Sequence, residues 1–292
     1  MRILLLGKNG QLGWEFQRTL LPLGEIIALD WPDVDFSKPE TLRELVRSLQ
    51  PQVIINAAAY TAVDRAETER ELCQAINAVA PAVLADEASR LRAAFIHYST
   101  DYVFDGNKGV AYVEGDEPAP LNAYGETKFS GEQHVQQAGE AYWIFRTSWV
   151  YSSRRDSFVS KVLEWARQRK SLKIVSDQVG GPTWCRMLAE ISTLALVQGR
   201  QDPFEWVKQT AGLYHLAGSG FTSRLEWAQE ILKHDPHPGE QLVEEVLPAR
   251  TADFPTPARR PLNTPLNCDL FEQTFHLSLP HWKNALKLMM EG

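Results

Sequence analysis

Cysteine and long hydrophobic runs are both scarce in this 292-residue chain. The three cysteines, Cys73, Cys185 and Cys268, lie far apart, which fits neither a disulfide framework nor a zinc site. No apolar run reaches the roughly 18 residues of a membrane-spanning helix. Met1–Leu6 lacks the charged start and the cleavage site of a secretion signal. We therefore expect a cytoplasmic protein with reduced thiols and no membrane contact.

A positive net charge is also absent. The formal net charge is −7 at pH 7, which argues against general binding to nucleic acids or anionic membranes. The seven histidines show no metal-binding spacing. Hydrophobic residues at 44% and charged residues at 23% are ordinary for a soluble globular protein. The length suffices for one large domain or two modest ones.

Short apolar runs alternate with helix-like segments in the first half of the chain. Such alternation predicts a parallel sheet with crossover helices. The predicted strands are Arg2–Leu6, Glu25–Asp30, Gln52–Ile55, Ala93–Tyr98 and Tyr142–Val150. The predicted helices are Gln11–Leu21, Pro39–Leu49, Leu72–Leu91 and Ala123–Gln137. The sequence therefore predicts an α/β fold, with a doubly wound parallel-sheet Rossmann domain for dinucleotide binding over residues 1–150.

The second half is less regular and contains more proline. Its helix-like segments are Phe158–Arg169, Cys185–Leu196, Ser223–Lys233 and Trp282–Met290. We interpret residues 151–292 mainly as a smaller α/β substrate-binding domain. Segments near 173–196 and 235–262 are expected to return to the first domain.

A glycine-rich turn follows the first predicted strand and opens the first predicted helix. It reads GKNGQLG from Gly7 to Gly13. In this context glycines let the backbone approach a pyrophosphate at a helix N-terminus. The spacing is Gly-x-x-Gly-x-x-Gly rather than the tighter Gly-x-Gly-x-x-Gly, so a plain strand-to-helix turn is the alternative. The expected cofactor-binding residues here are Gly7, Gly10, Gln11, Leu12 and Gly13.

Acidic residues after the second predicted strand bear on the choice of cofactor. Asp30 lies about 20 residues beyond the turn, where a carboxylate accepts hydrogen bonds from the adenosine ribose. A carboxylate there disfavours a 2′-phosphate and favours NADH over NADPH, although Lys8 could still reach that phosphate. Asp35 and Phe36 would bracket the adenine, with an ordinary turn and helix N-cap as the alternative.

Tyr124 and Lys128 form the candidate catalytic pair. They are four residues apart on a predicted helix, so their side chains leave the same face. An ammonium beside a phenol favours the phenolate and lowers the tyrosine pKa from about 10 towards neutral pH. Thr100, in Ser99-Thr100-Asp101, follows a predicted strand at the edge where parallel sheets bind ligands, with an ordinary turn as the alternative.

Further sequence blocks lie along almost the whole chain. They are NAAAYTAVD from Asn56, HYSTDYVFDG from His97, PLNAYGETKFSGE from Pro120, FRTSWVY from Phe145, DQVGGPT from Asp177, GLYHLAG from Gly212 and PTPARRPLN from Pro255. With the glycine turn, they resemble the extended branch of the short-chain dehydrogenase/reductase superfamily, which acts on nucleotide sugars. Within that branch the chain is similar to the dTDP-4-dehydrorhamnose reductase family.

The resemblance implies a reaction and a role for each candidate residue. NADPH or NADH would reduce the C4 carbonyl of dTDP-4-dehydro-L-rhamnose to give dTDP-L-rhamnose. Tyr124 would be the general acid, Lys128 would lower the pKa of Tyr124 and bind the nicotinamide ribose, and Thr100 would donate to the reacting oxygen. Further cofactor contacts are implied at Ala59, Tyr60, Thr61 and Tyr98.

Substrate contacts are expected at Thr100, Asp101, Trp149 and Arg260. Trp149 would cover the sugar or the nicotinamide, with core packing as the alternative. Arg260 offers bidentate hydrogen bonds to a diphosphate, with a surface salt bridge as the alternative. The segment from Tyr151 to Arg155 replaces a glycine-containing turn of the family, so the lip of the pocket is expected to differ. Relatives form homodimers, some bridged by a metal ion such as Mg²⁺, whose ligands no motif places in this chain.

Two other functions are compatible with the sequence. A nucleotide-sugar epimerase or dehydratase would use the same fold with a permanently bound NAD. Dehydratases usually need an additional acidic pair, whereas Thr100-Asp101 supplies one acid. A non-catalytic regulatory subunit on the same scaffold would bind the cofactor and modulate a partner enzyme. The presence of Thr100, Tyr124 and Lys128 together weighs against that role.

Overall fold

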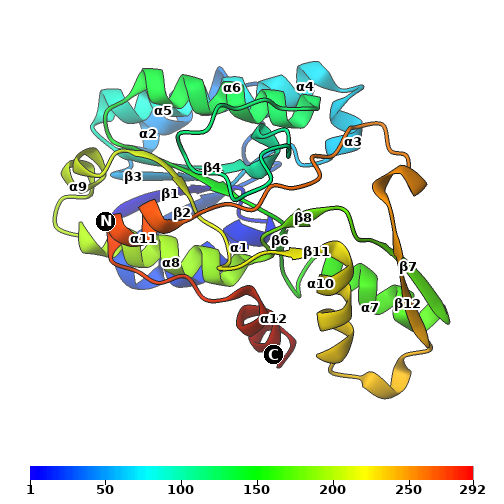
Figure 1. Ribbon diagram of the computed structural model, residues 1–292. Helices are drawn as coiled ribbons and strands as arrows, with labels where there is room; N and C mark the ends of the chain where they lie inside the picture. Colours follow the sequence, from blue (N-terminus) through cyan, green and yellow to red (C-terminus); the bar gives the residue numbers. More distant parts are fainter. Residues whose placement is uncertain (292) are drawn as a thin grey trace.

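The computed structural model describes residues 1–291, and a six-stranded parallel sheet forms its centre (Figure 1). The strands lie in the order β2 (Glu25–Leu29), β1 (Arg2–Leu6), β3 (Val53–Asn56), β4 (Ala94–Thr100), β5 (Tyr142–Thr147) and β10 (Gly212–His215). The chain runs from β1 outward to β2 and returns to the other side of β1 to form β3. The strand order therefore reverses between β1 and β3, and ligands bind at such a point in open α/β sheets. The predicted α/β, doubly wound fold is confirmed.

Alternate residues of each central strand face opposite layers. On β1, Ile3 and Leu5 pack into one hydrophobic core, whereas Leu4 and Leu6 pack into another. Both faces of the sheet are covered, which explains why the strands read as nearly continuous apolar runs.

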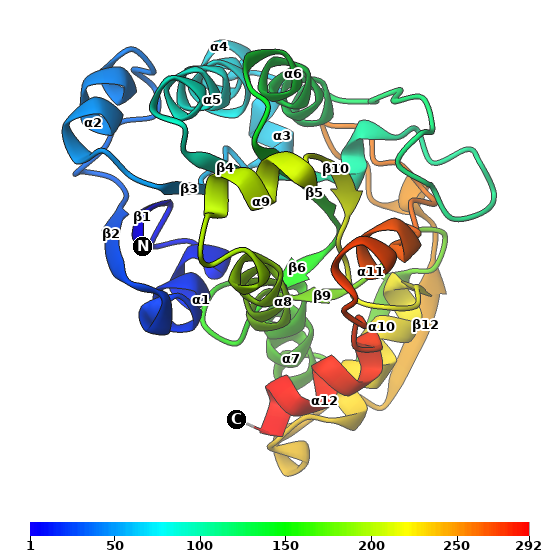
Figure 2. The same cartoon turned by 90° about the vertical axis from the view of Figure 1, so that its left-hand side faces the viewer.

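Helices cover both faces of the sheet (Figures 1 and 2). On one side lie α1 and α8, and on the other lie α2, α5 and α6. The bounds in this part are α1 Gln11–Thr19, η1 Leu21–Leu23, α2 Thr41–Leu49, α3 Val63–Ala66, α4 Arg70–Gln74, η2 Ala75–Val79, α5 Ala80–Leu91, η3 Asp101–Val103, α6 Ala123–Ala138, α8 Cys185–Gln198, α9 Pro203–Gln209 and α11 Asp269–Phe275.

A smaller lobe lies beside the carboxyl end of the sheet and has its own core. That core includes Tyr151, Leu172, Trp227 and Leu286. The lobe contains α7 Phe158–Gln168, β7 Ser171–Val175, α10 Arg224–Lys233, η4 Pro238–Glu240, β12 Glu245–Ala249, η5 Thr251–Asp253 and α12 Trp282–Glu291. Two short strand pairs lie between the lobe and the sheet: β6 Val150–Tyr151 with β9 Thr183–Trp184, and β8 Val179–Gly180 with β11 Thr222–Ser223.

Three segments differ from the sequence-based expectation. The long predicted helix 72–91 is interrupted by the π-helical turn η2. The predicted strand 142–150 ends at Thr147, because Trp149 adopts a left-handed φ of 44°. In the segment expected to return near 235–262, β12 pairs with β7 in the lobe, while residues 212–215 supply the sheet's last strand. The domain boundary near residue 150 stays a prediction.

Within residues 1–291, no helix is both long and apolar enough to cross a membrane.

A buried ion pair fastens α6 to β5. The Arg146 guanidinium donates from Nε to Glu132 Oε1 at 2.9 Å and from Nη2 to Oε2 at 2.6 Å. The two side chains are 3% and 1% exposed. Removing one partner would leave an uncompensated charge in the interior.

We expect Glu132→Gln to lower the free energy of unfolding by about 3 kcal/mol, because it leaves the Arg146 charge buried without a counterion. Urea denaturation followed by circular dichroism measures the change. Glu244→Gln is the matched control, because it breaks a Lys170 pair whose side chains are 79% and 68% exposed. The control should cost less than about 1 kcal/mol. Equal effects of the two substitutions would contradict the role of the buried pair.

Candidate active site

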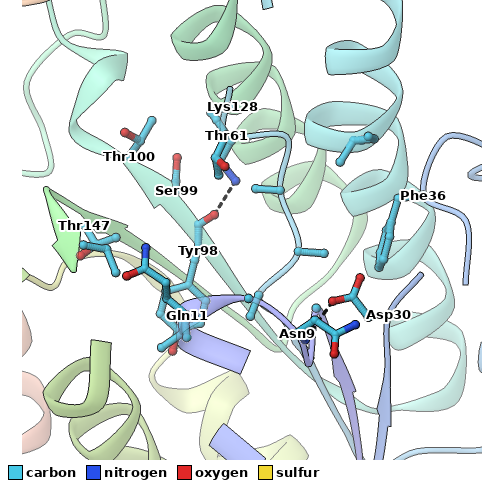
Figure 3. A pocket seen from close by; sticks show the side chains of 18 of the residues that line it. Asn9, Gln11, Asp30, Phe36, Thr61, Tyr98, Ser99, Thr100, Lys128 and Thr147 are labelled. Atoms are coloured by element: carbon cyan, nitrogen blue, oxygen red, sulfur yellow. Dashed lines mark hydrogen bonds between the residues drawn. The ribbon is translucent and has the colours of Figure 1, made fainter. Parts of the chain in front are cut away.

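A cavity of about 970 Å³ lies at the carboxyl ends of the parallel strands (Figure 3). Its lining brings together residues at or just beyond the ends of five strands: Gly7, Asp30, Ala57, Thr100 and Thr147. The cavity therefore spans the reversal between β1 and β3, as expected for a nucleotide site in this fold.

Close backbone contacts require glycine in the turn after β1. Gly7 has a φ of 88°, and a Cβ there would lie 2.7 Å from the Ala58 nitrogen. A Cβ on Gly13 would lie 2.0 Å from the Gly7 oxygen. Helix α1 starts at Gln11 with no side-chain cap at Gly10, so its first N–H groups lack a side-chain acceptor. Because Gly10, Gln11 and Leu12 line the cavity, this end of α1 can hold a phosphate.

Carboxylates line the end of the cavity beyond β2. Asp30 Oδ2 accepts a hydrogen bond from the Asn9 N–H at 2.9 Å, and its Oδ1 accepts from the Trp31 N–H at 2.8 Å. Asp35 accepts from the Ser37 hydroxyl and N–H, which lowers the pKa of Asp35. The Lys8 ammonium lies 2.6 Å from the Asp33 carboxylate. Lys8 is therefore paired with an acid, and this end of the cavity disfavours a 2′-phosphate.

Three buried polar atoms of the cavity wall have no hydrogen-bond partner among residues 1–291. They are Gln11 Oε1, Ser99 Oγ and Thr147 Oγ1. A buried polar group without a partner is destabilising, so these atoms fit a polar ligand. The glycine turn, the acidic end and these three atoms together fit a dinucleotide of the nicotinamide type.

Helix α6 carries the candidate catalytic pair close to the end of β4. The Asn122 side chain caps α6 by accepting from the Gly125 N–H at 2.9 Å. A Cβ on Gly125 would lie 2.3 Å from the Tyr102 oxygen, so glycine permits α6 to approach this turn. Tyr124 and Lys128 follow one helical turn apart, and both line the cavity.

Lys128 is buried, at 1% exposure, and bound to groups of β4 (Figure 3). Its ammonium donates to the Tyr98 carbonyl oxygen at 2.5 Å and lies 3.3 Å from His97 Nε2. Burial lowers the pKa of Lys128 to about 8. Burial, assisted by Lys128, also lowers the pKa of His97 well below its usual range, so His97 is a neutral acceptor. No sequence pattern assigned this role to His97.

Burial dominates the electrostatics of Tyr124. It raises the pKa of Tyr124 above its ordinary value, and the Thr100 hydroxyl opposes that rise. From the sequence we expected Lys128 to lower this pKa. In the structure the Lys128 ammonium is directed to Tyr98 and His97 instead. Tyr124 therefore keeps its proton at neutral pH, which suits a proton donor.

Asp101 connects three segments behind the cavity wall. Its Oδ2 accepts from the Ser148 hydroxyl at 2.9 Å and from the Thr264 hydroxyl at 2.6 Å, while Oδ1 lies 3.3 Å from Thr100 Oγ1. Asp101 is buried, which raises its pKa. It does not line the cavity, whereas Thr100 does. Asp101 thus lies behind Thr100 and does not face the cavity itself.

Most of the predicted site residues line this cavity, but Gly13, Tyr60, Asp101 and Arg260 do not. The Tyr60 hydroxyl donates to Glu69 Oε2 at 2.5 Å, and burial raises the pKa of Tyr60 to about 12. Arg260 Nη2 donates to Asp64 Oδ2 at 2.8 Å, so its guanidinium is already paired.

Asn77 supports the cavity wall and was missed in the sequence. Its side chain accepts from the Tyr60 N–H at 2.8 Å and donates to the Tyr60 carbonyl at 3.1 Å. These bonds fix the segment that holds Ala59 and Thr61 beside the cofactor cavity. Asn77 lies in the π-helical turn η2, which helical periodicity does not reveal.

Trp149 separates the main cavity from a smaller one of about 280 Å³, since it lines both. Its ring stacks on Trp227 with centroids 5.5 Å apart. A Cβ on Gly180 would lie 2.6 Å from Trp149 Cε2, so Gly180 leaves the space that the indole fills. The rest of the lining of the smaller cavity consists of Val150, Phe158, Lys161, Arg224 and Trp227.

Within the described part of the chain, no group of three or more His, Cys, Asp or Glu side chains is placed to hold a metal ion. The expectation of Mg²⁺ stays a prediction.

The chain matches known proteins over its full length. The model of the RmlD substrate binding domain family matches residues 1–292. The dTDP-4-dehydrorhamnose reductase of Escherichia coli (strain K12) is 44% identical over 295 residues, covering 99% of this chain and 97% of that protein. The chain belongs to the RmlD substrate binding domain family.

Solved structures agree with membership of the RmlD family. A dTDP-4-dehydrorhamnose reductase from Clostridium acetobutylicum is 34% identical, with a TM-score of 0.90 and coverage of 100% of this chain and 99% of that chain. A dTDP-4-dehydrorhamnose reductase from Bacillus anthracis in complex with NADP is 31% identical, with a TM-score of 0.88 and coverage of 99% and 98%. The resemblance inferred from the sequence blocks is confirmed.

The buried lysine of this RmlD-family chain should impose a pH limit. Because burial lowers the pKa of Lys128 to about 8, its positive charge is present below that pH and lost above it. We expect cofactor affinity to fall as the pH rises through about 8. Fluorescence titration with NADH between pH 6.5 and 9.5 measures this, with Lys128→Met as the control that should lose the transition. A wild-type affinity that is flat across this range would contradict the assignment.

Gly180 should act through Trp149. We expect Gly180→Ala to displace the indole, because the added methyl would lie 2.6 Å from Trp149 Cε2. The KM for the sugar substrate should rise by about 10-fold, the scale of one lost well-packed contact, while cofactor binding is unchanged. Gly181→Ala is a matched control, since its nearest neighbour would be 3.6 Å away. Steady-state kinetics measure the KM for the sugar substrate in both variants. Equal KM values for Gly180→Ala and Gly181→Ala would exclude this role of Gly180.

Proposed function

We propose that this chain reduces the C4 keto group of dTDP-4-dehydro-L-rhamnose to give dTDP-L-rhamnose, with NADPH or NADH as reductant. The observation that carries the proposal is one cavity lined by the glycine turn together with Thr100, Tyr124 and Lys128. Relatives of the same family that match over nearly the whole chain, and are named for this reaction, support the choice of substrate.

Tyr124 is the proton donor in this proposal. Its raised pKa keeps the phenol protonated at neutral pH, ready to give a proton to the carbonyl oxygen as negative charge develops there. The Thr100 hydroxyl lies 3.3 Å from Asp101 Oδ1. Such a long hydrogen bond is weak, so the hydroxyl can turn to donate to the same carbonyl oxygen.

Lys128 holds the cofactor in this proposal. An ammonium has three N–H donors. One is directed to the Tyr98 carbonyl and one to neutral His97, which leaves a third for a ribose hydroxyl. When bound, the reduced nicotinamide supplies the hydride for the carbonyl carbon. Gln11, Ser99 and Thr147 offer their unpaired polar atoms to the remainder of the cofactor.

A nucleotide-sugar substrate, a homodimer and a cytoplasmic location belong to the same proposal. The homodimer has support in the outer face of α8, where Leu194 and Val197 are 49% and 38% exposed. A second copy of the chain would cover these side chains.

We expect Tyr124→Phe to reduce turnover by at least about 10²-fold, because it removes the proton donor at little change in volume. Cofactor oxidation at 340 nm with dTDP-4-dehydro-L-rhamnose measures turnover with NADH and with NADPH. Cofactor binding, followed by fluorescence, should be kept. Tyr142→Phe is the control, because Tyr142 lies in β5 and does not line the cavity.

Undiminished reduction by the Tyr124→Phe variant would contradict its role as the acid. A wild-type protein that carries bound NAD and converts a nucleotide sugar without consuming added cofactor would be an epimerase or dehydratase instead. A wild-type protein that binds cofactor but turns over no sugar would favour the regulatory-subunit function.

A further inference from the structure

The smaller cavity of about 280 Å³ opens between α7 and α10 and has no role in the reaction described so far. It shares Trp149 and Val150 with the main cavity. Its remaining lining consists of two aromatic side chains, Phe158 and Trp227, and two cations, Lys161 and Arg224. A ligand that occupied both cavities would therefore pass Trp149.

Arg224 is a cation held among aromatic rings. Its Cζ lies 3.7 Å from the Trp149 ring centroid, 4.9 Å from that of Phe158 and 5.3 Å from that of Trp227. No carboxylate of residues 1–291 lies within 4.0 Å of its guanidinium, and no group in that range accepts a hydrogen bond from it. The buried Arg146, by contrast, has Glu132 as its counterion.

Arg224 has no carboxylate in contact, and the buried Asp101 favours its charge only from a distance. Burial lowers the pKa of Arg224 to about 10, which still leaves it charged at neutral pH. Aromatic faces attract a cation but do not accept its N–H groups as an anion does. The planar guanidinium suits bidentate recognition of a phosphate. Lys161 adds a second charge at the rim, exposed and without a carboxylate within 4.0 Å among the residues the structure describes.

Arg260 is the other arginine considered for a diphosphate. Its Nη2 is bound to Asp64 at 2.8 Å, and it lines neither cavity. Binding a phosphate at Arg260 would require breaking that pair, whereas Arg224 has no pair to break.

We propose that Arg224 and Lys161 bind the diphosphate of the nucleotide sugar in the smaller cavity, while the sugar extends past Trp149 to Thr100 and Tyr124. The identity of the nucleotide sugar rests on the proposed function. The position of the anion rests on the unpaired cations and the aromatic walls.

The test uses dTDP as the probe, with thymidine as the probe without phosphate. Calorimetric titrations are made on the full chain with NADH at saturation. We expect Arg224→Met to weaken dTDP binding by about 10- to 100-fold, the range for losing hydrogen bonds to a charged group. Thymidine binding should change little, and Arg224→Lys should recover part of the dTDP affinity. Lys161→Met should weaken dTDP binding less, because Lys161 is exposed.

Arg169→Met is the matched control, since Arg169 is an exposed arginine after α7 in the same lobe and lines neither cavity. It should bind dTDP as the wild type does. In turnover, Arg224→Met should raise the KM for the keto sugar with kcat at saturation nearly kept, and cofactor affinity should be unchanged.

Two results would overturn the proposal: wild-type dTDP affinity in Arg224→Met, or equal losses for dTDP and thymidine, which would mean that Arg224 only supports Trp149. Failure of the proposed function is recognised separately. If the wild type reduces no keto sugar but binds dTDP through Arg224, the reaction is wrong and the diphosphate site stands. If the wild type reduces the keto sugar and Arg224→Met binds dTDP as tightly as the wild type, the proposed reaction stands and the proposed diphosphate site is wrong.

Discussion

The buried pair between Glu132 and Arg146 fastens to the sheet the helix α6 that carries Tyr124 and Lys128. Arg146 lies on β5 directly beside Ser99 of β4 in the sheet register, so Glu132 ties α6 to the sheet at this level. Lys128 is one helical turn earlier on the same face and meets the Tyr98 carbonyl. Tyr124 is one turn earlier again, beyond the end of the strand. The spacing of four residues thus places a counterion, an ammonium and a phenol in line along one helix.

Burial along this face of α6 shifts the pKa values of Lys128 and Tyr124 in opposite directions, and both shifts suit the proposed reaction. It lowers the pKa of Lys128 and raises the pKa of Tyr124, because a low-dielectric interior disfavours the charged form of either group. At neutral pH the phenol therefore retains a proton to give, and the ammonium retains its charge. The neutral His97 ring beneath Lys128 accepts from the ammonium without adding a second positive charge. The site needs no phenolate in the free protein.

Local patterns in the sequence predicted most of the sheet and the cavity. Alternating apolar runs located five of its six strands, and the glycine turn and the Tyr124–Lys128 spacing are short-range signals with a direct geometric meaning. Long-range contacts could not be read in the same way. Arg260 binds Asp64, which lies 196 residues earlier in the sequence. The Arg260 guanidinium, which the sequence suggested as a bidentate ligand for a diphosphate, is therefore already occupied. Arg224 follows a helix N-cap and shows no distinguishing motif. The pKa direction of Tyr124 depends on burial by several segments, so spacing alone gave the opposite sign.

Trp149 shows how the two parts of the molecule are joined. Its left-handed φ is uncommon for a bulky side chain and persists only where the surroundings hold it. Those surroundings come from separate segments: Gly180 leaves space on one side of the ring, while Trp227 and Arg224 pack against it from α10. In the proposed reaction, residues on and beside the sheet hold the cofactor and the proton donor, and the lobe shapes the Trp149 ring that borders them. Changes in α7 or α10 can therefore alter which nucleotide sugar is accepted without moving Tyr124 or Lys128, which are held by β4 and β5.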